Sequence, residues 1–358
     1  MERILNYLQR AIDEDASDVF IIAGDAVSMK KDGEIVPITD KEEKLMPDET
    51  ESLVRALYEM AERPMDQFLS AGDDDFSLSV VDMARFRVNT YRQRGSLAAV
   101  IRIVSFGIPD WQKLGIPEEV MKIARRTRGM VLVTGPAGSG KSTTLACVVD
   151  AVNRSRSAHI ITIEDPIEYL HRNDMSIISQ RELALDTTSY VKALRASLRQ
   201  SPDVILLGEM RDLETIQTAM TAAETGHLLI STLHTVGAVN TIDRIIDVFP
   251  PAQQQQVRVQ LAQVLKTVIS QQLLPTVDGK RVPAFEIMHL NNAVRTLVRE
   301  SRIHQIDSVI QTSAAEGMIS MDESILRLHK AGRISKEIAL QYAMNPDQLQ
   351  KKLAGLPR

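Results

Sequence analysis

The sequence predicts an α/β chain in which a domain with a mostly parallel sheet follows a smaller α+β domain. In the larger part, short apolar runs of strand length alternate with segments long enough for crossover helices, which favours a parallel sheet. These runs lie at residues 130–134, 160–163, 204–207 and 228–233. In the smaller part, strands and helices follow one another without regular alternation.

Glycine and proline gather between the two parts, at residues 106–117. This is the composition of a linker, so the predicted domains are 1–112 and 113–358. Trp111, the only tryptophan, lies in this stretch and could anchor it to either domain.

In the small domain, the apolar residues from Ile4 to Ile12 recur at helical spacing and predict an opening helix. A second helix is expected over residues 47–61. The pair Asp32-Gly33, set between two short apolar runs, predicts a hairpin turn. Further strands are expected at residues 19–22, 76–81, 86–91 and 98–104. This domain carries no catalytic signature of its own.

The larger domain is expected to end in helices. Residues 253–274 are bracketed by prolines and carry an apolar stripe that includes Leu261, which predicts one long helix. The pair Asp278-Gly279 predicts a second hairpin turn. From about residue 291 to residue 358 the chain is predicted to be helical.

Composition excludes several classes of protein. The chain has 358 residues, a net charge of −5 and only 4% aromatic residues, so it offers neither a basic field nor stacking platforms, and no nucleic-acid partner is expected. A single cysteine, Cys147, excludes an internal disulfide and a multi-cysteine zinc site. No basic-then-apolar leader opens the chain, and no apolar run approaches the ~18 residues that a membrane span needs. We therefore expect a cytoplasmic protein without an integral membrane segment.

One stretch fits the phosphate-loop pattern G-x-x-x-x-G-K-[ST]. Its residues are Gly135, Pro136, Ala137, Gly138, Ser139, Gly140, Lys141, Ser142 and Thr143. A predicted strand precedes it and a segment without glycine or proline follows, which is the context that the pattern needs. Inward backbone N–H groups and a helix N-terminus would bind phosphate oxygens. Lys141 is expected to reach the β- and γ-phosphates and the Ser142 hydroxyl to ligate Mg²⁺. The sequence thus predicts a site for a magnesium nucleoside triphosphate.

Acids and histidines flank three of the predicted strands. Ligands bind beyond the carboxyl ends of parallel strands, so the residues there are candidates for catalysis. Glu164, Glu209 and His234 each follow a strand within two residues, and His227 stands directly before one. Each alone has a structural interpretation, as a helix cap or a core histidine. Together with Lys141 they predict a catalytic group.

The chemistry of phosphoryl transfer assigns roles to this group. Transfer to water needs a carboxylate that orients the water and acids that hold Mg²⁺. Glu164 and Glu209 both qualify as the base, and the sequence does not rank them. Gly208 stands where many phosphate-loop proteins carry aspartate, so Glu209 is expected to contact Mg²⁺ through water. His234 is a candidate for sensing the γ-phosphate.

Arginines gather on two predicted strands of the small domain. Arg85 and Arg87 lie two residues apart and so share one face of a strand, and Arg102 follows on a later strand. Two interpretations stay open: a solvated basic face, or arginine fingers that reach the phosphates bound by a neighbouring subunit.

These residues together resemble the secretion ATPase superfamily, and specifically its type IV pilus retraction ATPases of the PilT kind. Besides the phosphate loop, residues 161–168, 198–212 and 223–235 resemble that family's Asp box, Walker B segment and His box. Residues 241–250 are also typical of it. The resemblance covers nearly the whole chain.

The resemblance implies a RecA-like ATPase domain preceded by a PAS-like domain, with ATP as the substrate. It also implies a homohexamer in which Arg87 and Arg102 lie in segments that supply arginines to a nucleotide site. The hexamer would act on an inner-membrane pilus platform protein, at the inner face of the cytoplasmic membrane, to power pilus retraction and twitching motility.

Retraction is favoured over assembly within the superfamily. Assembly ATPases typically carry a four-cysteine zinc site and a longer N-terminal region, whereas this chain has one cysteine. Residues 293–300 resemble the retraction-type C-terminal motif. Two departures, Ala137 for threonine and Val294 for isoleucine, leave open an accessory paralogue. The alternatives are a pilus-assembly or type II secretion ATPase and, further away, a hexameric nucleic-acid translocase.

Overall fold

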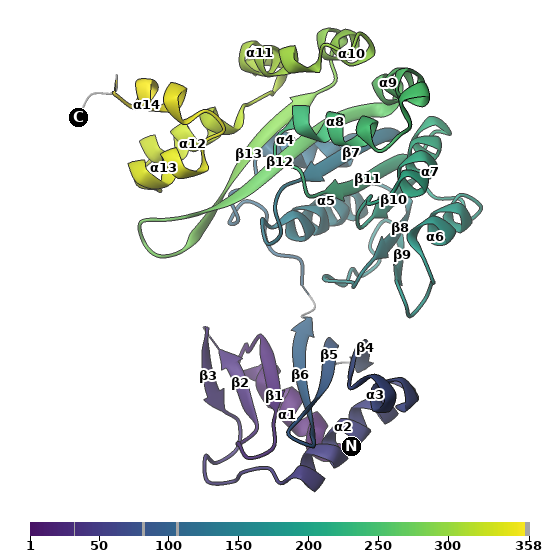
Figure 1. Cartoon of the computed structure of the whole chain (residues 1–358), viewed down its shortest axis with the longest axis vertical. Coiled ribbons are helices and arrows are strands. Elements are labelled where there is room, and N and C mark those ends of the chain that lie inside the picture. The colour runs from purple at the N-terminus through teal and green to yellow at the C-terminus, as the bar shows by residue number, and fades with distance from the viewer. Residues whose placement is uncertain (32, 81–82, 105–106, 355–358) are drawn as a thin grey trace. The chain divides into compact units, whose positions relative to one another are not determined.

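The computed structural model describes residues 1–31, 33–80, 83–104 and 107–354. The chain divides into two compact units (Figure 1). Their bounds are Met1–Gly107 with Glu168–Leu170 for the first, and Ile108–Ile167 with His171–Arg358 for the second.

The first unit is a six-stranded antiparallel sheet in the order β3-β2-β1-β6-β5-β4, with three helices. Its elements are α1 (Glu2–Asp13), β1 (Asp18–Ile21), β2 (Ser28–Lys31), β3 (Glu34–Pro37), α2 (Pro47–Met60), α3 (Asp66–Ala71), β4 (Asp73–Val80), β5 (Ala84–Gln93) and β6 (Ser96–Val104). Helix α2 packs on β6, and α1 packs on β1 and on α2, around one apolar core. This α+β arrangement confirms the predicted fold class and is consistent with a PAS-like domain.

The hairpin predicted in this unit is present. Lys31 pairs with Glu34 across the turn, and of the predicted turn residues Asp32 lies outside the described part of the chain. The strands and the first two helices of this unit are present as predicted, except that residue 81 of the predicted strand 76–81 lies outside the described residues. The short helix α3 was not predicted, and residues 108–112 of the predicted first domain belong to the second unit.

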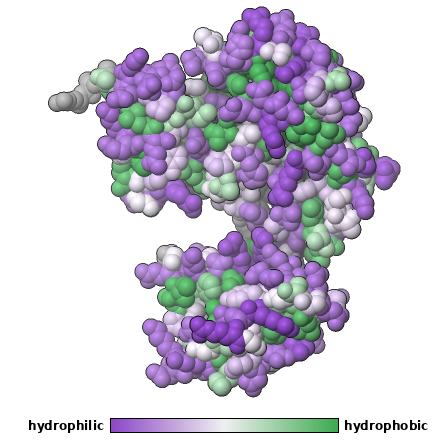
Figure 2. Space-filling view, viewed as in Figure 1, coloured by the Kyte–Doolittle hydropathy of each residue, from purple (hydrophilic) through white to green (hydrophobic). Residues whose placement is uncertain are grey.

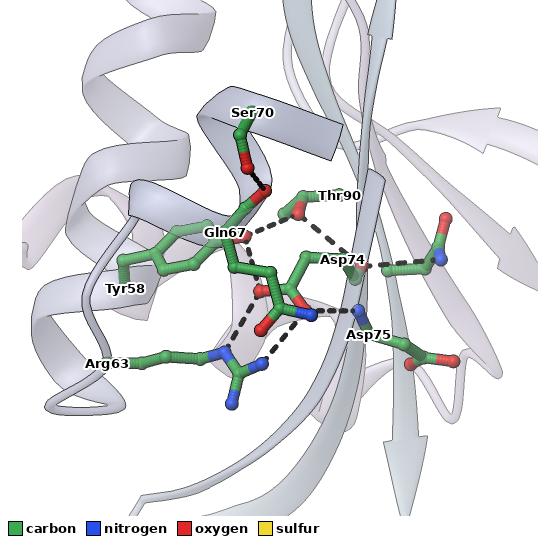
Figure 3. Close-up of polar contacts among 8 residues, drawn as sticks. Tyr58, Arg63, Gln67, Ser70, Asp74, Asp75 and Thr90 are labelled. Atoms are coloured by element: carbon green, nitrogen blue, oxygen red, sulfur yellow. Dashed lines mark hydrogen bonds and ion pairs between the residues drawn. The ribbon is translucent and has the colours of Figure 1, made fainter. Parts of the chain in front are cut away.

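A buried carboxylate fastens α2 to the sheet of the first unit (Figure 3). Arg63 donates to both oxygens of Asp74, each over 2.9 Å, and the Tyr58 hydroxyl donates to Asp74 Oδ2 over 3.0 Å. Burial raises the pKa of Tyr58 to about 12, so its phenol stays a donor. Thr90 Oγ1 lies 2.8 Å from the same phenol oxygen. The next residue, Asp75, faces solvent and pairs with Arg87 instead.

We expect Asp74→Ala to lower the free energy of unfolding by about 3 kcal/mol, because it leaves Arg63 and Tyr58 without their shared acceptor. Urea denaturation measures the change. Asp75→Ala is the matched control, since it removes an exposed pair that contributes less than about 1 kcal/mol. Equal losses in the two variants would contradict the assignment of Asp74 as the buried anchor.

The second unit is built on a seven-stranded sheet in the order β13-β12-β7-β11-β10-β8-β9. Every neighbouring pair is parallel except the β12–β13 hairpin. Its strands are β7 (Gly129–Thr134), β8 (His159–Glu164), β9 (Ile177–Glu182), β10 (Val204–Leu207), β11 (Leu228–Leu233), β12 (Leu265–Pro275) and β13 (Arg281–His289). Its helices are α4 (Glu118–Met121), α5 (Lys141–Ser155), α6 (Tyr190–Ser197), α7 (Leu213–Glu224), α8 (Ala238–Asp247), α9 (Pro251–Val264), α10 (Asn292–Arg299), α11 (Ile306–Thr312), α12 (Met321–Lys330), α13 (Lys336–Tyr342) and α14 (Pro346–Ala354), with short 3₁₀ helices at Lys122–Arg125, Ile303–Gln305 and Ala314–Glu316.

Helices cover both faces of this sheet, as an apolar, mostly parallel sheet requires. Alternate residues of β7 enter different cores. Met130 and Leu132 pack with α6 to α10, and Val131 and Val133 pack with α4 and α5. The four strands predicted from the sequence are all present, and the mostly parallel sheet is confirmed.

The predicted helix over residues 253–274 is wrong. Helix α9 ends at Val264, and β12 begins at Leu265 and runs beside β7. The pairing register shifts between Leu265 and Thr267, so Lys266 is an extra, bulged residue at the start of β12. The apolar stripe that suggested a helix continues into a strand that is buried between two neighbours, where periodicity alone does not separate the two structures.

The segment that precedes α4 packs on the second unit. Ile108, Trp111 and Leu114 are half-buried against the core around α5. Cys147 Sγ lies 3.4 Å from the Pro109 carbonyl oxygen. Trp111 therefore contacts the second unit, whereas the sequence left open which domain it would contact.

The chain from α10 onward is helical, as predicted, and α12 to α14 form a small core of their own with the far ends of β12 and β13. Among the described residues, no helix combines the length and apolar character needed to cross a membrane. On the face seen in Figure 2, hydrophilic residues cover most of the surface of each unit.

Candidate nucleotide site

The phosphate loop joins β7 to α5. Gly135 has φ 144° and Gly140 has φ 86°. A Cβ at Gly135 would lie 2.1 Å from the Gln271 carbonyl oxygen, so only glycine fits there. The Lys141 ammonium, 9% exposed, donates to the carbonyl oxygens of Gly135 and Pro136 over 2.8 and 2.9 Å. The loop therefore curls around its own lysine at the N-terminus of a 15-residue helix, which is a cradle for phosphate.

Strand β12 holds this loop from the side. Thr144 Oγ1 donates to Gln271 Oε1 over 2.8 Å, and the Gln271 amide nitrogen would lie 2.9 Å from a Cβ at Gly140. Thr144 and Gln271 are both buried. Gln271 was not predicted as a site residue, because residues 253–274 were expected to form a helix, whereas Gln271 lies in β12 beside the loop.

Glu209 follows β10 at the same edge of the sheet. Thr232 Oγ1 donates to the Gly208 carbonyl oxygen over 2.6 Å, which places Glu209 beside the end of β11. Its side chain is 11% exposed, and Oε1 pairs with Arg211 at 2.5 Å. Oε2 is buried, makes no hydrogen bond to the described residues, and lies 3.4 Å from His234 Nε2. A buried carboxylate oxygen without a donor is unusual in a folded protein and points to a ligand or water.

His234 and the loop meet at this edge. The Gly135 N–H donates to the Leu233 carbonyl oxygen over 3.3 Å, so the loop starts beside the residue that precedes His234. The His234 side chain is 58% exposed. The structure thus brings Lys141, Glu209 and His234 to one place.

Glu164 ends β8, which is separated from β7 by the two strands β11 and β10. Its Oε1 accepts from Thr162 Oγ1 over 2.7 Å and from Gln180 Nε2 over 3.4 Å. Glu164 therefore lies at the edge that was predicted, further along the sheet from the loop than Glu209 is.

The surroundings of residue 208 favour glycine over a residue with a side chain. A Cβ there would lie 2.8 Å from the Tyr190 hydroxyl and 3.2 Å from the Ile163 carbonyl oxygen, so an aspartate would require the Tyr190 side chain to move. Burial, and then the carboxylates of Asp165 and Glu209, raise the pKa of Tyr190 well above its usual value. This phenol among the acids was also missed, since nothing in its local sequence distinguishes it from a helix-start residue after the Ser189 cap.

His227 lies at the opposite edge of the sheet. Its carbonyl oxygen accepts from Gly129 at the start of β7, whereas the loop follows the end of β7. The six residues of β11 separate it from His234 by about 20 Å. Its Nδ1 lies 3.0 Å from the Ala222 carbonyl oxygen and 3.1 Å from Thr225 Oγ1. Within one chain the structure does not support the predicted catalytic role of His227, which instead fixes the turn between α7 and β11.

Arg87 and Arg102 lie directly opposite each other on β5 and β6 of the first unit. Arg87 pairs with Asp75 at 2.8 Å, and Arg102 pairs with Asp18 at 3.0 Å. Both guanidinium groups are partly exposed. Directly opposed residues of paired strands share one face, so the two arginines and their acids form one polar face of that sheet.

A cavity of about 290 Å³ adjoins the loop. Its lining includes two residues of the loop and α5, two leucines and two arginines: Gly140, Thr143, Leu114, Leu273, Arg281 and Arg333. The residues present also fit a magnesium nucleotide. Ser142, the second residue of α5, is exposed next to Lys141, and Glu209 Oε2 offers a buried acceptor.

Comparison with known proteins decides the family. A family model described as Type II/IV secretion system protein matches residues 1–338. The chain belongs to this family. Among its members, a twitching motility protein of Neisseria gonorrhoeae is 51% identical over 276 residues, which is 77% of this chain and 74% of that protein. The type IV pilus retraction ATPase PilT of Pseudomonas aeruginosa is 43% identical over 333 residues, 93% of this chain and 95% of that protein.

The solved structures agree with this family. The crystal structure of the pilus retraction motor PilT with bound ADP has a TM-score of 0.90 and 44% identity, and the match covers 97% of this chain and 99% of that one. These similarities confirm the resemblance inferred from the motifs and the α/β fold class of this secretion-system family member.

Proposed function

We propose that this chain is the subunit of a homohexameric motor that hydrolyses ATP, with Mg²⁺, to power type IV pilus retraction. The observation that carries the ATPase assignment is the buried, donor-free oxygen of Glu209 beside His234, at the edge that holds the phosphate loop. The pilus assignment is supported by the names of the twitching motility and retraction proteins compared above.

The loop residues bind the triphosphate. Backbone N–H groups of the loop and of the first turn of α5 surround the phosphate oxygens, and Lys141 exchanges its two carbonyl contacts for oxygens of the β- and γ-phosphates. The Ser142 hydroxyl and, through water, Glu209 would hold Mg²⁺, which would neutralise charge on the phosphates.

Glu209 is the proposed base. Its Oε2 accepts a hydrogen bond from the attacking water, which orients the water toward the γ-phosphate. The imidazole of His234, 3.4 Å from that oxygen, is placed to sense whether the γ-phosphate is present. Glu164 is a supporting acid, because its Oε1 already accepts from two side chains.

The cavity beside the loop is the proposed nucleoside site. It lies against Gly140 and Thr143, on the side of the loop where the rest of a nucleotide would extend. Leu114 and Leu273 offer apolar surface for a base, and Arg281 and Arg333 offer donors for polar atoms.

Arg87 and Arg102 are proposed to act on the nucleotide of the neighbouring subunit. Both pair with carboxylates on one face of the first unit and keep exposed guanidinium groups that a neighbouring subunit can contact. Hydrolysis then depends on assembly, because the first unit of one subunit completes the site of the next.

We expect Arg102→Ala to lower turnover by about 10²-fold or more without weakening hexamer formation, because an arginine finger acts on the transition state. ATPase assays together with light scattering measure both quantities. Arg55→Ala, on the exposed surface of α2, is the control. Unchanged turnover in an intact Arg102→Ala hexamer would remove Arg102 from the site.

The physiological function is tested in a strain that lacks this chain. A retraction motor is proposed to bind a platform protein at the inner face of the cytoplasmic membrane, so its loss should leave excess, unretracted pili. Loss of all pili would instead indicate an assembly ATPase. Stimulation of ATP hydrolysis by single-stranded DNA would indicate a nucleic-acid translocase.

A further inference from the structure

Glu286 is a buried carboxylate that the proposed chemistry does not use. It lies in β13, opposite Ser270 of β12, and is 5% exposed. Burial raises its pKa. A charge is costly to bury unless it is hydrogen-bonded, so its partners indicate what it does.

Glu286 accepts hydrogen bonds from the first residues of two helices. Its Oε1 accepts from the Ala238 N–H of α8 over 2.7 Å, and its Oε2 accepts from the Met321 N–H of α12 over 3.4 Å. Helix α8 has no side-chain cap of its own, and Ser270 Oγ accepts from the preceding N–H, that of Gly237, over 2.9 Å. The β12–β13 hairpin therefore supplies the N-cap that α8 lacks.

The start of α8, which Glu286 contacts, is joined to the nucleotide site by the turn that follows β11. Gly237 stands three residues after His234. In the first turn that follows, Thr241 Oγ1 lies 2.8 Å from Thr235 Oγ1 and 3.5 Å from Thr134 Oγ1, at the end of β7. The position of the α8 N-terminus thus sets the turn that carries His234 beside Glu209.

The start of α12, which Glu286 also contacts, is joined to the other C-terminal helices by Asp322. Asp322, the residue after Met321, accepts from the N–H groups of Met344 and Asn345, between α13 and α14, over 2.6 and 3.0 Å. A cavity of about 260 Å³ lies along these contacts, lined by Gly237, Glu286, Asp322 and Met344 among others. Glu286, Met321 and Asp322 all line this cavity, and the bond to α8 is the shorter of the two that Glu286 accepts.

We propose that Glu286 is a positioning residue of the ATPase cycle, which links the turn after His234 to the N-terminus of α12. Changes at the γ-phosphate edge reach α12 through this carboxylate, beside the backbone pair Ile287–Ile319 and the Phe285 N–H bond to Ser324 Oγ that also hold α12 on β13. The inference rests on the proposed placement of the γ-phosphate beside Glu209 and His234.

The test uses the full-length hexamer and Glu286→Gln, which keeps the size of the side chain but places an amide group against one of the two N–H donors. Amide hydrogen exchange is measured with and without a non-hydrolysable ATP analogue, over residues 234–241 and 319–326. In the unchanged protein both segments should respond to the analogue. In Glu286→Gln the first response should stay while the second falls, and kcat should fall about fivefold with nucleotide affinity unchanged.

Controls separate coupling from stability. Glu323→Gln, on the exposed side of α12, should keep both responses. If Glu286→Gln does not fold, Glu286→Asp shortens the side chain so that it cannot reach both N–H groups, and it should weaken the α12 response in the same way. A full α12 response in a folded Glu286→Gln protein, or none in the unchanged protein, would overturn the inference. Failure of the unchanged protein to bind the analogue or hydrolyse ATP would instead overturn the proposed function.

Discussion

Lys141→Ala should abolish ATP turnover and weaken nucleotide binding. The ammonium is the one cation inside the curl of the loop among the described residues, and it lies at the N-terminus of α5 with its charge directed at the loop carbonyls. Removing it takes away charge-assisted contacts to phosphate, each of about 1.5–3 kcal/mol, so binding should weaken by at least about tenfold. Turnover should fall further, because the same contacts strengthen as charge develops in the transition state.

Fluorescent-nucleotide titration and a phosphate-release assay measure the two effects. Lys280→Ala is the control, since that lysine is 80% exposed and lies beside Asp278 in the β12–β13 turn. If Lys141→Ala kept normal turnover, the loop would not be the hydrolysis site.

Glu209→Gln should spare binding and stop hydrolysis. The amide cannot accept the proton of the attacking water, so turnover should fall by about 10²–10⁴-fold, the usual contribution of a general base. Nucleotide affinity should change little, because the phosphates are held by the loop. The thermal midpoint should stay the same or rise, since the variant removes a buried charge whose Oε2 has no donor among the described residues.

Two comparisons make this result specific. Glu214→Gln, at an exposed pair with Arg195, should leave turnover unchanged. Glu164→Gln ranks the two acids: a smaller loss than in Glu209→Gln supports Glu209 as the base, and a larger loss would reverse the assignment.

Much of this site could be predicted because strand order carries spatial information. The carboxyl ends of parallel strands meet at one edge, so residues that follow β7, β10 and β11 were expected together, and Lys141, Glu209 and His234 are found there. The same rule places His227 elsewhere. It precedes its strand, so it lies at the edge of the sheet where the strands begin, away from Lys141, Glu209 and His234.

Gln271 and Tyr190 could not be predicted, because their roles depend on contacts with residues far away in the sequence. Gln271 reaches Thr144 only because β12 runs beside β7, and the residues around it read equally well as a helix. Tyr190 matters because Gly208 leaves space for its hydroxyl. Neither contact has a local signature, whereas the phosphate loop is defined by neighbouring residues.

The bulge at Lys266 has a consequence for how this chain tolerates changes in length. The register that follows it sets which side chains of β12 point to each side, so that Gln271 meets Thr144 while Gln272 Nε2 reaches the Tyr342 carbonyl oxygen. Deleting Lys266 would remove the bulge and leave the register from Thr267 onward unchanged, whereas deleting one residue between Thr267 and Gln271 would exchange the two sides of the strand beyond it and turn each glutamine away from its partner. In the exposed turn after β12, a change in length does not alter which way strand side chains face. Residues 277–279 are therefore the place to insert tags and labels for following the motor.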